Sequence, residues 1–386
     1  MDYRPTVVKI NLENFRHNVR VLRQASGEGN FFCPMIKANG YGHGDVELAR
    51  VLEAEGVSCV GVALMEEGIR LREAGINRLD ILVLYPIREA KDFQKMIKYR
   101  LTPVLSSWEG VRALEKISFE GSIPVHLKFD TGMSRLGFAP SEARRVRDFL
   151  DGQTKVRVAG VCSHLLAGED IGSTSSRTRE QIRRFAPVAK TFEGPGVRIH
   201  LWNSSGLLGA YALELMQKEN WGARPGIALY GAKPKMSFSN RSARKRYEDL
   251  ELKPVMSVHS EIVQIHNLRK GETVSYGGTY RARRASVIGV VPMGYADGYM
   301  RHLSSKGEML CGGSKARVAG IVCMDYTMLD LTGVMPPKKG WLGEPVVVLG
   351  EQAAKRVHVE DLARRAKTNT YEVFTNMSGR VPRVFV

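Results

Sequence analysis

The chain has 386 residues, which is long for a single hydrophobic core, and its apolar content of 43% is sufficient for two domains. No apolar run reaches the roughly 20 residues that a membrane-spanning helix needs, so we expect no membrane partner. The net charge of +17 is large enough to attract nucleic acid, but the basic residues are spread along the chain without a helix-turn-helix, RRM or zinc-finger pattern. We therefore interpret most of this charge as solvated surface and expect no nucleic-acid partner.

The cysteines and the first residues indicate the cellular compartment of the protein. The five cysteines are scattered and include no C-x-x-C pair, which favours buried thiols in a reducing compartment over disulfides or a bound metal. The first residues contain no apolar segment typical of a signal peptide. These features predict a cytoplasmic protein without a metal site.

Short apolar runs alternate with amphipathic stretches from Thr6 to about Gly231. The apolar runs predict strands at Phe32–Lys37, Cys59–Ala63, Ile81–Leu84, Thr102–Leu105, Val125–Phe129, Ala159–His164, Arg198–Leu201 and Ile227–Tyr230. The stretches between them predict helices at Asp45–Glu55, Glu66–Ala74, Ile87–Tyr99, Trp108–Lys116, Ser141–Leu150 and Arg177–Lys190. Eight such strands in about 230 residues fit a closed (β/α)8 TIM-like barrel better than an open sheet.

Residues 31–44 are the most informative stretch of this predicted barrel. Their sequence is Phe-Phe-Cys-Pro-Met-Ile-Lys-Ala-Asn-Gly-Tyr-Gly-His-Gly, in which an apolar run ends at Lys37 and glycines follow. Burial disfavours the ammonium form, so a lysine at the end of a buried strand has a lowered pKa. A Schiff-base lysine beside a phosphate-bearing cofactor would be built this way, although a strand-capping lysine before an ordinary glycine loop fits these residues equally well. Lys37, His164 and Asn203-Ser204 all follow predicted strands, the position of functional groups in such barrels.

Beyond Ala232 the pattern changes, and we place the domain boundary between residues 241 and 242. Residues 234–251 are polar and basic and are interpreted as a linker. The remaining segments predict a mainly antiparallel domain, with strands at Val255–Ile265, Ala285–Val291, Ala316–Val322, Thr327–Leu331, Pro345–Leu349 and Val381–Val386 and a helix at Val359–Ala366. We thus expect a barrel over residues 1–241 and a C-terminal β-domain over residues 242–386.

A series of short motifs runs through both predicted domains. They are Lys-Ala-Asn-Gly-Tyr-Gly-His-Gly at 37–44, Lys-Phe-Asp-Thr-Gly-Met-Ser-Arg-Leu-Gly at 128–137, His164, His200 with Asn203-Ser204, Arg-Pro-Gly-Ile-Ala-Leu-Tyr-Gly at 224–231, Val-Ser-Tyr-Gly at 274–277, Gly-Tyr-Ala-Asp-Gly at 294–298, Cys-Met-Asp at 323–325, Tyr-Glu-Val at 371–373 and Arg-Val-Pro-Arg at 380–383. In this order and spacing the chain resembles alanine racemases, the pyridoxal-phosphate enzymes with a barrel followed by a β-domain. The resemblance extends from Arg4 to Arg383.

The resemblance implies two bases on opposite faces of the substrate carbon. Lys37 would hold pyridoxal 5′-phosphate as a Schiff base and exchange a proton with one face. Tyr276 would exchange a proton with the other face, and the cations of a hydrogen-bond path through His164 and Arg224 would lower its pKa. Considered without the resemblance, Tyr276 is better explained as a β-turn aromatic residue.

The resemblance also implies how the cofactor ring is held. Arg224, oriented by His200, would donate a hydrogen bond to the pyridine nitrogen. Arginine does not act as an acid near neutral pH, so this nitrogen would stay unprotonated. That arrangement disfavours the misplaced protonation that leads to transamination.

The remaining site residues follow from the same resemblance. Hydroxyl and backbone N–H groups would bind the phosphate, namely those of Tyr41, Ser204, Tyr371, Gly226 and Ile227. Arg135 would contact the phenolic oxygen of the cofactor and the substrate carboxylate, and the backbone of Met324 would also contact this carboxylate. Lys128 occupies a position that is often carbamylated, and Tyr295 and Arg301 would line the entrance.

The implied function is the interconversion of L-alanine and D-alanine, which supplies D-alanine for peptidoglycan. The implied assembly is a homodimer in which Tyr276 of one subunit completes the Lys37 site of the other. Two departures from the family pattern, Ser134 in place of a common glycine and Tyr326 in place of a usual glutamine, leave the substrate preference open. A racemase of another amino acid, such as serine or lysine, and a non-catalytic pyridoxal-phosphate-binding protein remain alternatives.

Overall fold

The structure is a computed structural model that describes residues 4–173, 175–216, 220–337 and 339–386. The chain divides into two compact units. The barrel unit comprises Arg16–Gly40 and Asp45–Leu252, and the C-terminal unit comprises Met1–Phe15, Tyr41–Gly44 and Lys253–Val386. The division therefore differs from a single cut after residue 241, because two N-terminal segments belong to the C-terminal unit.

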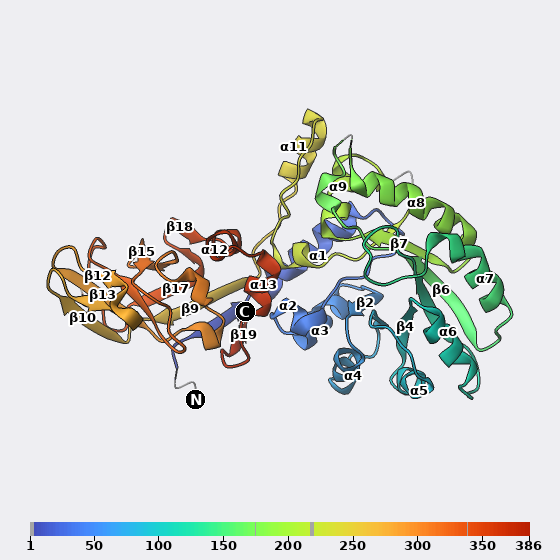
Figure 1. Cartoon of the computed structure of the whole chain (residues 1–386), viewed down its shortest axis with the longest axis horizontal. Coiled ribbons are helices and arrows are strands. Elements are labelled where there is room, and N and C mark those ends of the chain that lie inside the picture. The colour runs from blue at the N-terminus through green and yellow to red at the C-terminus, as the bar shows by residue number, and fades with distance from the viewer. Residues whose placement is uncertain (1–3, 174, 217–219, 338) are drawn as a thin grey trace. The chain divides into compact units, whose positions relative to one another are not determined.

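The barrel unit contains a parallel sheet with strands in chain order (Figure 1). These strands are β2 (Cys59–Val62), β3 (Asp80–Val83), β4 (Leu101–Leu105), β5 (Ile123–Lys128), β6 (Val156–Cys162), β7 (Arg198–Trp202) and β8 (Gly222–Ala223). Residues 31–36 join the two edges, since Phe32 forms a parallel bridge to Ala223 and Met35 forms one to Gly61. The predicted (β/α)8 barrel is thereby confirmed.

Helices surround this sheet, and short polar side chains fix where several of them begin. The helices are α1 (Leu12–Ala25), α3 (Asp45–Ala54), α4 (Met65–Glu73), α5 (Ala90–Lys98), α6 (Trp108–Glu115), α7 (Ala143–Asp151), α8 (Arg177–Phe192) and α9 (Ser204–Ala212). Ser107, Ser176 and Asn203 precede α6, α8 and α9 and accept hydrogen bonds from backbone N–H groups of the first turn. Because β2 and β4 are buried along their whole length, they show the continuous apolar runs typical of parallel barrel strands.

Two of the strands predicted for the barrel differ in the structure. Ile227–Tyr230 forms the 3-10 helix η3, and the last barrel strand is β8 instead. A short apolar run does not distinguish a buried strand from a buried helical turn by its periodicity. The expected strand Phe32–Lys37 is limited to the two bridges, because Pro34 lacks an N–H group and the backbone turns at Lys37.

The C-terminal unit is built on a mainly antiparallel sheet, as predicted. Along the sheet the strands are β10 (Gln264–Leu268), β13 (Ser286–Val291), β16 (Thr327–Asp330), β15 (Ser314–Val318), β14 (Glu308–Cys311), β17 (Pro345–Gln352), β9 (Met256–Glu261), β1 (Val7–Ile10) and β19 (Arg383–Phe385), and β18 (Lys355–Val357) pairs with β17. The expected strand Val255–Ile265 is two strands, β9 and β10. Residues of β9 alternate between buried and partly exposed, so one face of the sheet covers a core.

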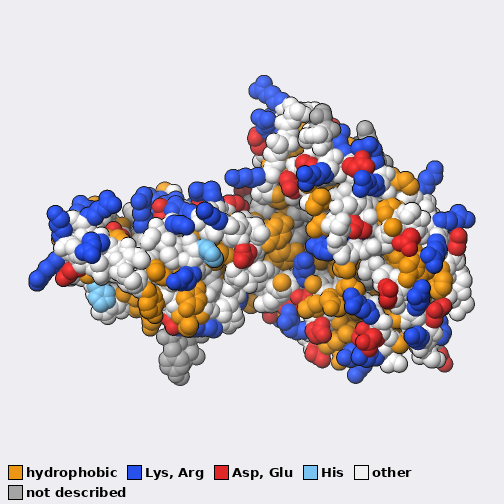
Figure 2. All heavy atoms as spheres, in the orientation of Figure 1, with side chains coloured by type: hydrophobic (Ala, Val, Ile, Leu, Met, Phe, Trp, Pro, Cys, Tyr) orange, Lys and Arg blue, Asp and Glu red, His pale blue; other side chains and the backbone are white. Residues whose placement is uncertain are grey.

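Helices and a small hairpin complete the two units. The C-terminal unit contains α12 (Val359–Ala366), at the predicted residues, α13 (Thr370–Thr375) and the hairpin of β11 (Thr273–Val274) and β12 (Tyr280–Arg281). Helix α11 (Arg241–Asp249) lies in the stretch that was interpreted as a linker. Among the described residues, no helix is long and apolar enough to cross a membrane. Lys and Arg side chains are spread over both units on the face seen in Figure 2, which agrees with a solvated basic surface.

Candidate active site

Lys37 begins a short left-handed turn at the C-terminal end of the barrel. Ala38, Asn39 and Tyr41 have φ angles of 52°, 54° and 52°, and Gly40 between them has a φ of 59°. Left-handed backbone costs roughly 1–2 kcal/mol for each residue other than glycine, so surrounding contacts must hold this turn. Strained backbone of this kind is concentrated at functional sites.

Hydrogen bonds within the barrel unit hold the turn in place. The backbone N–H of Ala38 donates to Oε1 of Glu67 at 2.6 Å, and Oε2 of Glu67 accepts from the N–H groups of Ala63 and Leu64. Oδ1 of Asn39 accepts from the N–H of Asp45 at 3.2 Å. Glu67, on α4, therefore ties the turn that follows Lys37 to the loop after β2.

The surroundings of Lys37 favour its neutral, nucleophilic form. Burial lowers the pKa of Lys37, and the nearby positive charge of Arg135 lowers it further, while Glu67 acts in the opposite direction. Lys128, the last residue of β5, is also buried and its pKa is lowered, first by desolvation. A lysine with a lowered pKa can form a Schiff base with a carbonyl compound.

A cluster of cations surrounds His164. Burial lowers the pKa of His164, and the charges of Arg224, Arg135, Lys128 and Lys37 lower it further, in that order. His164 is therefore neutral near pH 7. The structure thus brings together five residues that the sequence analysis placed in one site, and it surrounds them with excess positive charge suited to a phosphate or a carboxylate.

Arg224 is a buried arginine that has only neutral hydrogen-bond partners among the described residues. Its side chain is 4% exposed. Nη1 donates to Nδ1 of His200 at 2.6 Å and to the His200 carbonyl at 2.9 Å, and Nη2 donates to the Ser163 carbonyl at 2.6 Å. A guanidinium group has five N–H donors, so two remain without a partner in the described part of the chain. An acceptor from a ligand would satisfy this buried cation.

Hydrogen bonds join Ser204 to the segment after Arg224, and both were predicted to bind phosphate. Oγ of Ser204 accepts from the N–H of Gly226 at 2.9 Å and from the N–H of Ala228 at 3.2 Å. The Gly226 N–H, predicted to bind phosphate, is thus bonded to Ser204. The Ser204 hydroxyl hydrogen and the Ile227 N–H are the donors left for a ligand.

The other two predicted phosphate ligands lie together in the C-terminal unit. The rings of Tyr41 and Tyr371 have their centroids 6.0 Å apart. The segment that carries Tyr41 packs against α13, because a Cβ atom on Gly42 would lie 2.3 Å from the carbonyl oxygen of Phe374. Nε and Nη2 of Arg383 each donate to the Gly42 carbonyl at 3.1 Å. Glycine is therefore required where this segment approaches the helix.

Tyr276 stands on an exposed turn of the C-terminal unit, between β11 and β12. It is 68% exposed, and Met324 is 52% exposed. Oγ of Ser275 donates to the Ile321 carbonyl at 2.6 Å, which ties the turn of Tyr276 to the loop of Met324. Backbone N–H groups of Tyr295 and Ala296 donate to the carbonyls of Cys323 and Met324 at 3.0 Å. The residues predicted from this domain are therefore gathered on neighbouring loops.

Two residues near the site were missed by the sequence analysis. Glu67 supports the turn after Lys37, and its signal was its place in the first turn of a predicted helix. His126, on β5, has its Nδ1 2.7 Å from Nε2 of His200 and so extends the chain of contacts from Arg224. A histidine two residues before Lys128 in an otherwise apolar strand was the signal for this second residue.

The fold and the site define a class of protein. It is a (β/α)8 barrel with an appended antiparallel β-domain, in which a desolvated lysine, further cations and the hydroxyl group of Ser204 belong to the barrel unit. The family model described as Alanine racemase, N-terminal domain matches residues 10–234, and Alanine racemase, C-terminal domain matches residues 255–385.

Individual proteins give the same result. An alanine racemase of Sorangium cellulosum is 38% identical over 99% of this chain and 99% of its own length, and one of Carboxydothermus hydrogenoformans is 36% identical over 99% and 100%. The crystal structure of alanine racemase from E. faecalis superimposes with a TM-score of 0.87 at 31% identity, covering 100% of this chain and 99% of that one. The chain belongs to the alanine racemase family of isomerases, which in general use pyridoxal phosphate.

Proposed function

We propose that this protein interconverts L-alanine and D-alanine with pyridoxal 5′-phosphate held by Lys37. The observation that carries the proposal is the environment of Lys37, which is desolvated, lies beside Arg135 and begins a turn held in left-handed backbone. The family supports alanine as the substrate. The D-alanine formed in the cytoplasm is proposed to supply peptidoglycan.

The donor set fits this cofactor. Arg224 has two buried N–H groups without a protein acceptor among the described residues, and the pyridine nitrogen is an acceptor without a proton to donate. Ser204 and Ile227 in the barrel unit, and Tyr41 and Tyr371 in the C-terminal unit, are the hydroxyl and amide donors proposed for the phosphate. When bound, pyridoxal phosphate withdraws electrons from the α-carbon of an attached amino acid, which makes the α-proton removable.

The residues of the chain then supply the proton transfers. The proposed roles place Nζ of Lys37 at one face of the α-carbon and the hydroxyl of Tyr276 at the other, so that a proton removed from one face is replaced on the opposite one. The lowered pKa of Lys37 suits a base that must be neutral before it accepts a proton. Arg135 would hold the substrate carboxylate with its planar guanidinium group.

The neutral partners of Arg224 support its proposed electronic role. Arg224 stays cationic, and Nδ1 of His200 accepts from it, so neither group offers a proton to the ring nitrogen. Burial and the charge of Arg224 lower the pKa of His200, which keeps this histidine neutral. The ring would therefore remain a moderate electron acceptor, and the proton would return to the α-carbon.

Lys128 is proposed to be carbamylated. Its buried amine has a lowered pKa, so a neutral fraction is available to react with carbon dioxide. The product is an anion, which would stand near Arg135 and orient its guanidinium group. Intact mass measured with and without added bicarbonate would detect it, and a Lys128→Ala variant that gains the same mass would contradict this site.

We further propose a homodimer with shared active sites. Tyr276 is a large aromatic residue that is mostly exposed and has no hydrogen-bond partner among the described residues. A closed two-fold dimer would create two equivalent sites in which Tyr276 of one subunit serves Lys37 of the other. The exposed loops of Tyr295 and Met324 would then belong to the same interface.

A chiral assay tests the function. The purified, cofactor-loaded protein should convert L-alanine into a racemic mixture, and L-serine and L-lysine should react more slowly. Faster turnover of serine or lysine would make the protein a racemase of that amino acid. A protein that absorbs visible light as a pyridoxal-phosphate Schiff base but racemises none of these substrates would be a binding protein only.

A further inference from the structure

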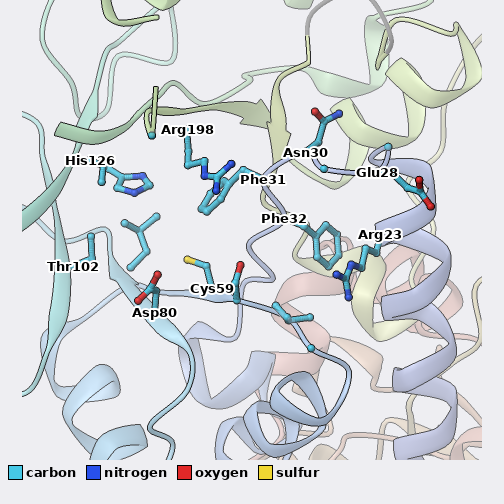
Figure 3. Close-up of a pocket in the computed structure, with 18 of the residues that line it drawn as sticks. Arg23, Glu28, Asn30, Phe31, Phe32, Cys59, Asp80, Thr102, His126 and Arg198 are labelled. Atoms are coloured by element: carbon cyan, nitrogen blue, oxygen red, sulfur yellow. The ribbon is translucent and has the colours of Figure 1, made fainter. Parts of the chain in front are cut away.

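A cavity opens at the N-terminal end of the barrel strands (Figure 3). Its volume is about 910 Å³, and Cys59, Asp80 and Arg198, the first residues of β2, β3 and β7, are among the residues that line it. Lys128, in contrast, is the last residue of β5. In (β/α)8 barrels the N-terminal end usually serves stability, so a cavity of this size there needs an explanation.

Two arginines that line this cavity have no hydrogen-bond or ion-pair partner among the described residues. Arg157 on β6 and Arg198 on β7 come from neighbouring strands, and both are exposed. No hydrogen bond or ion pair joins either guanidinium group to another group in the described part of the chain. In Figure 3 the side chain of Arg198 extends toward Phe31, beside His126. Two uncompensated guanidinium groups at one opening attract an anion.

The charged residues of the lining leave a net positive charge, because Arg20 is paired with Glu55 and the other three arginines outnumber the two acidic residues. Nε and Nη2 of Arg20 donate to the Glu55 carboxylate at 2.7 and 2.9 Å, and Nη1 of Arg23 donates to the Glu55 carbonyl at 2.9 Å. The acidic residues of the lining are Glu28 and Asp80. Asp80 is the first residue of β3, and its carboxylate would repel an anion bound in the cavity.

His126 connects this cavity to Arg224 through a chain of fixed tautomers. Arg224 can only donate, so Nδ1 of His200 must accept, and the proton of neutral His200 is on Nε2. That N–H must donate to Nδ1 of His126, 2.7 Å away, so the proton of His126 is on its Nε2. No protein group in the described ranges accepts from this Nε2–H, and the ring lines the cavity.

We infer that this cavity binds a small anion, a carboxylate or a phosphate, held by Arg157, Arg198 and the Nε2–H of His126. An acceptor at this N–H completes the hydrogen-bond chain that ends at Arg224. Any effect on turnover rests on the function proposed above, because it passes through the role given to Arg224. Binding itself does not depend on that function.

Calorimetric titration of the cofactor-loaded protein with inorganic phosphate and, separately, with succinate tests the inference. The Lys37 site is then occupied, and chloride keeps the ionic strength constant. We expect saturable binding that Arg157→Gln with Arg198→Gln weakens at least about tenfold, since two charge-assisted contacts are lost. Arg241→Gln, a change of an exposed arginine outside the cavity, should leave binding unchanged. Binding of phosphate alone or of succinate alone supports the site and identifies the anion.

Two further variants test the geometry. Asp80→Asn should tighten binding about two- to fivefold, because a negative charge facing the anion is removed. His126→Asn should weaken binding by about two- to tenfold, because Asn keeps an acceptor near His200 but does not reach the cavity. The absence of saturable binding to the wild-type protein, equal binding by the double arginine variant, or weaker binding by Asp80→Asn would overturn the proposal. None of these results depends on racemase activity.

Discussion

The two residues proposed as bases have contrasting surroundings. Lys37 is desolvated, lies near Arg135 and precedes a left-handed turn that Glu67 holds through the N–H of Ala38. Tyr276 is 68% exposed on the turn of a small hairpin, and its hydroxyl forms no hydrogen bond with a described residue. The barrel unit thus lowers the pKa of Lys37 through its own residues, whereas the C-terminal unit leaves Tyr276 exposed.

This contrast shows how a two-base site can be divided between parts of a protein. Buried ionisable groups need partners within one rigid body, and the barrel unit supplies them to Lys37, His164 and Arg224 through its strands. An exposed tyrosine needs a cationic environment from elsewhere before it can act as a base near neutral pH. The experiments below test each half of this comparison.

Replacing Lys37 should have the largest effect. Lys37→Ala removes both the proposed Schiff-base nitrogen and one base, so racemisation of alanine should fall at least about 10⁴-fold. Borohydride reduction followed by peptide mapping should place the pyridoxyl group on Lys37 in the wild-type protein. Lys9→Ala, a change of an exposed lysine, should alter neither result. Label on another lysine of the wild-type protein would refute the assignment.

Arg224→Glu tests whether Arg224 and its neutral hydrogen-bond partners keep the ring nitrogen of the cofactor unprotonated. A carboxylate would accept a hydrogen bond from a protonated ring nitrogen and so favour that form, and the bond to His200 would be lost, so racemisation should fall by about 10²- to 10³-fold. The fraction of turnovers that end in pyridoxamine phosphate, measured by chromatography of the released cofactor, should rise. Arg224→Lys keeps the cation and should not raise this fraction. An unchanged fraction in Arg224→Glu would show that Arg224 has only a structural role.

Mixed dimers test whether Tyr276 acts on the partner subunit. Lys37→Ala and Tyr276→Phe proteins should each be nearly inactive. After subunit exchange, half of the dimers carry one site with both changes and one intact site, so roughly a quarter of wild-type activity should return. Each variant exchanged with itself is the control. Activity that stays at the level of the separate variants would place both residues in one subunit.

The buried histidines of the barrel unit predict a stability that depends on pH. Burial, assisted by the charges of Arg224 and Arg157, lowers the pKa of His126 to about 3. Below pH 6.5 the unfolded chain binds a proton here that the folded chain does not. The free energy of unfolding therefore falls with decreasing pH by about 1.4 kcal/mol per pH unit for this residue.

His126→Asn should remove this contribution. In urea unfolding between pH 6.5 and 5, the free energy of unfolding of the variant should fall less steeply with decreasing pH than that of the wild-type protein. The two slopes should differ by about 1.4 kcal/mol per pH unit, whatever stability the variant loses at neutral pH. His302→Asn changes an exposed histidine and should keep the wild-type slope. A wild-type slope in His126→Asn would mean that His126 is protonated in the folded protein.

The sequence predicted the frame of the fold better than its irregular parts. Strands β2 to β7 were located because apolar runs alternate with amphipathic helices, and helix α12 was located from its amphipathic pattern. Helix α9 was missed because most of its residues are buried, including glycines and leucines, so it has no polar face. The short strand β8 was missed because Gly222–Ala223 carries no apolar run.

The site was predictable where position along a strand decides chemistry. Lys37 and His164 were expected at strand ends, and the charge of Lys37 lowers the pKa of His164 there. The left-handed conformation of Ala38 and Asn39 was not predictable, because neither residue type requires it. Ser134 also adopts a positive φ of 56°, a conformation that glycine would adopt at no steric cost.

The contact between His126 and His200 depends on tertiary structure. These residues lie on β5 and β7, which are not adjacent, and inward side chains of alternate strands share a layer inside a (β/α)8 barrel. The sequence shows only two histidines in separate apolar strands, which does not predict that their side chains are in contact. Only the relative stagger of the strands places their rings at hydrogen-bonding distance.

The position of β1 between β9 and β19, next to one edge of the C-terminal sheet, has a consequence for synthesis on the ribosome. Val8 pairs with Arg383 of β19 on one side and with Val258 of β9 on the other. Strand β1 therefore cannot pair with β9 until Met256–Glu261 has been synthesised, and it cannot pair with β19 until Arg383–Phe385 has been synthesised. Residues 16–252 can meanwhile begin to assemble around strands that are already present. The pairing of β1 is therefore complete only after both β9 and the distant β19 are available.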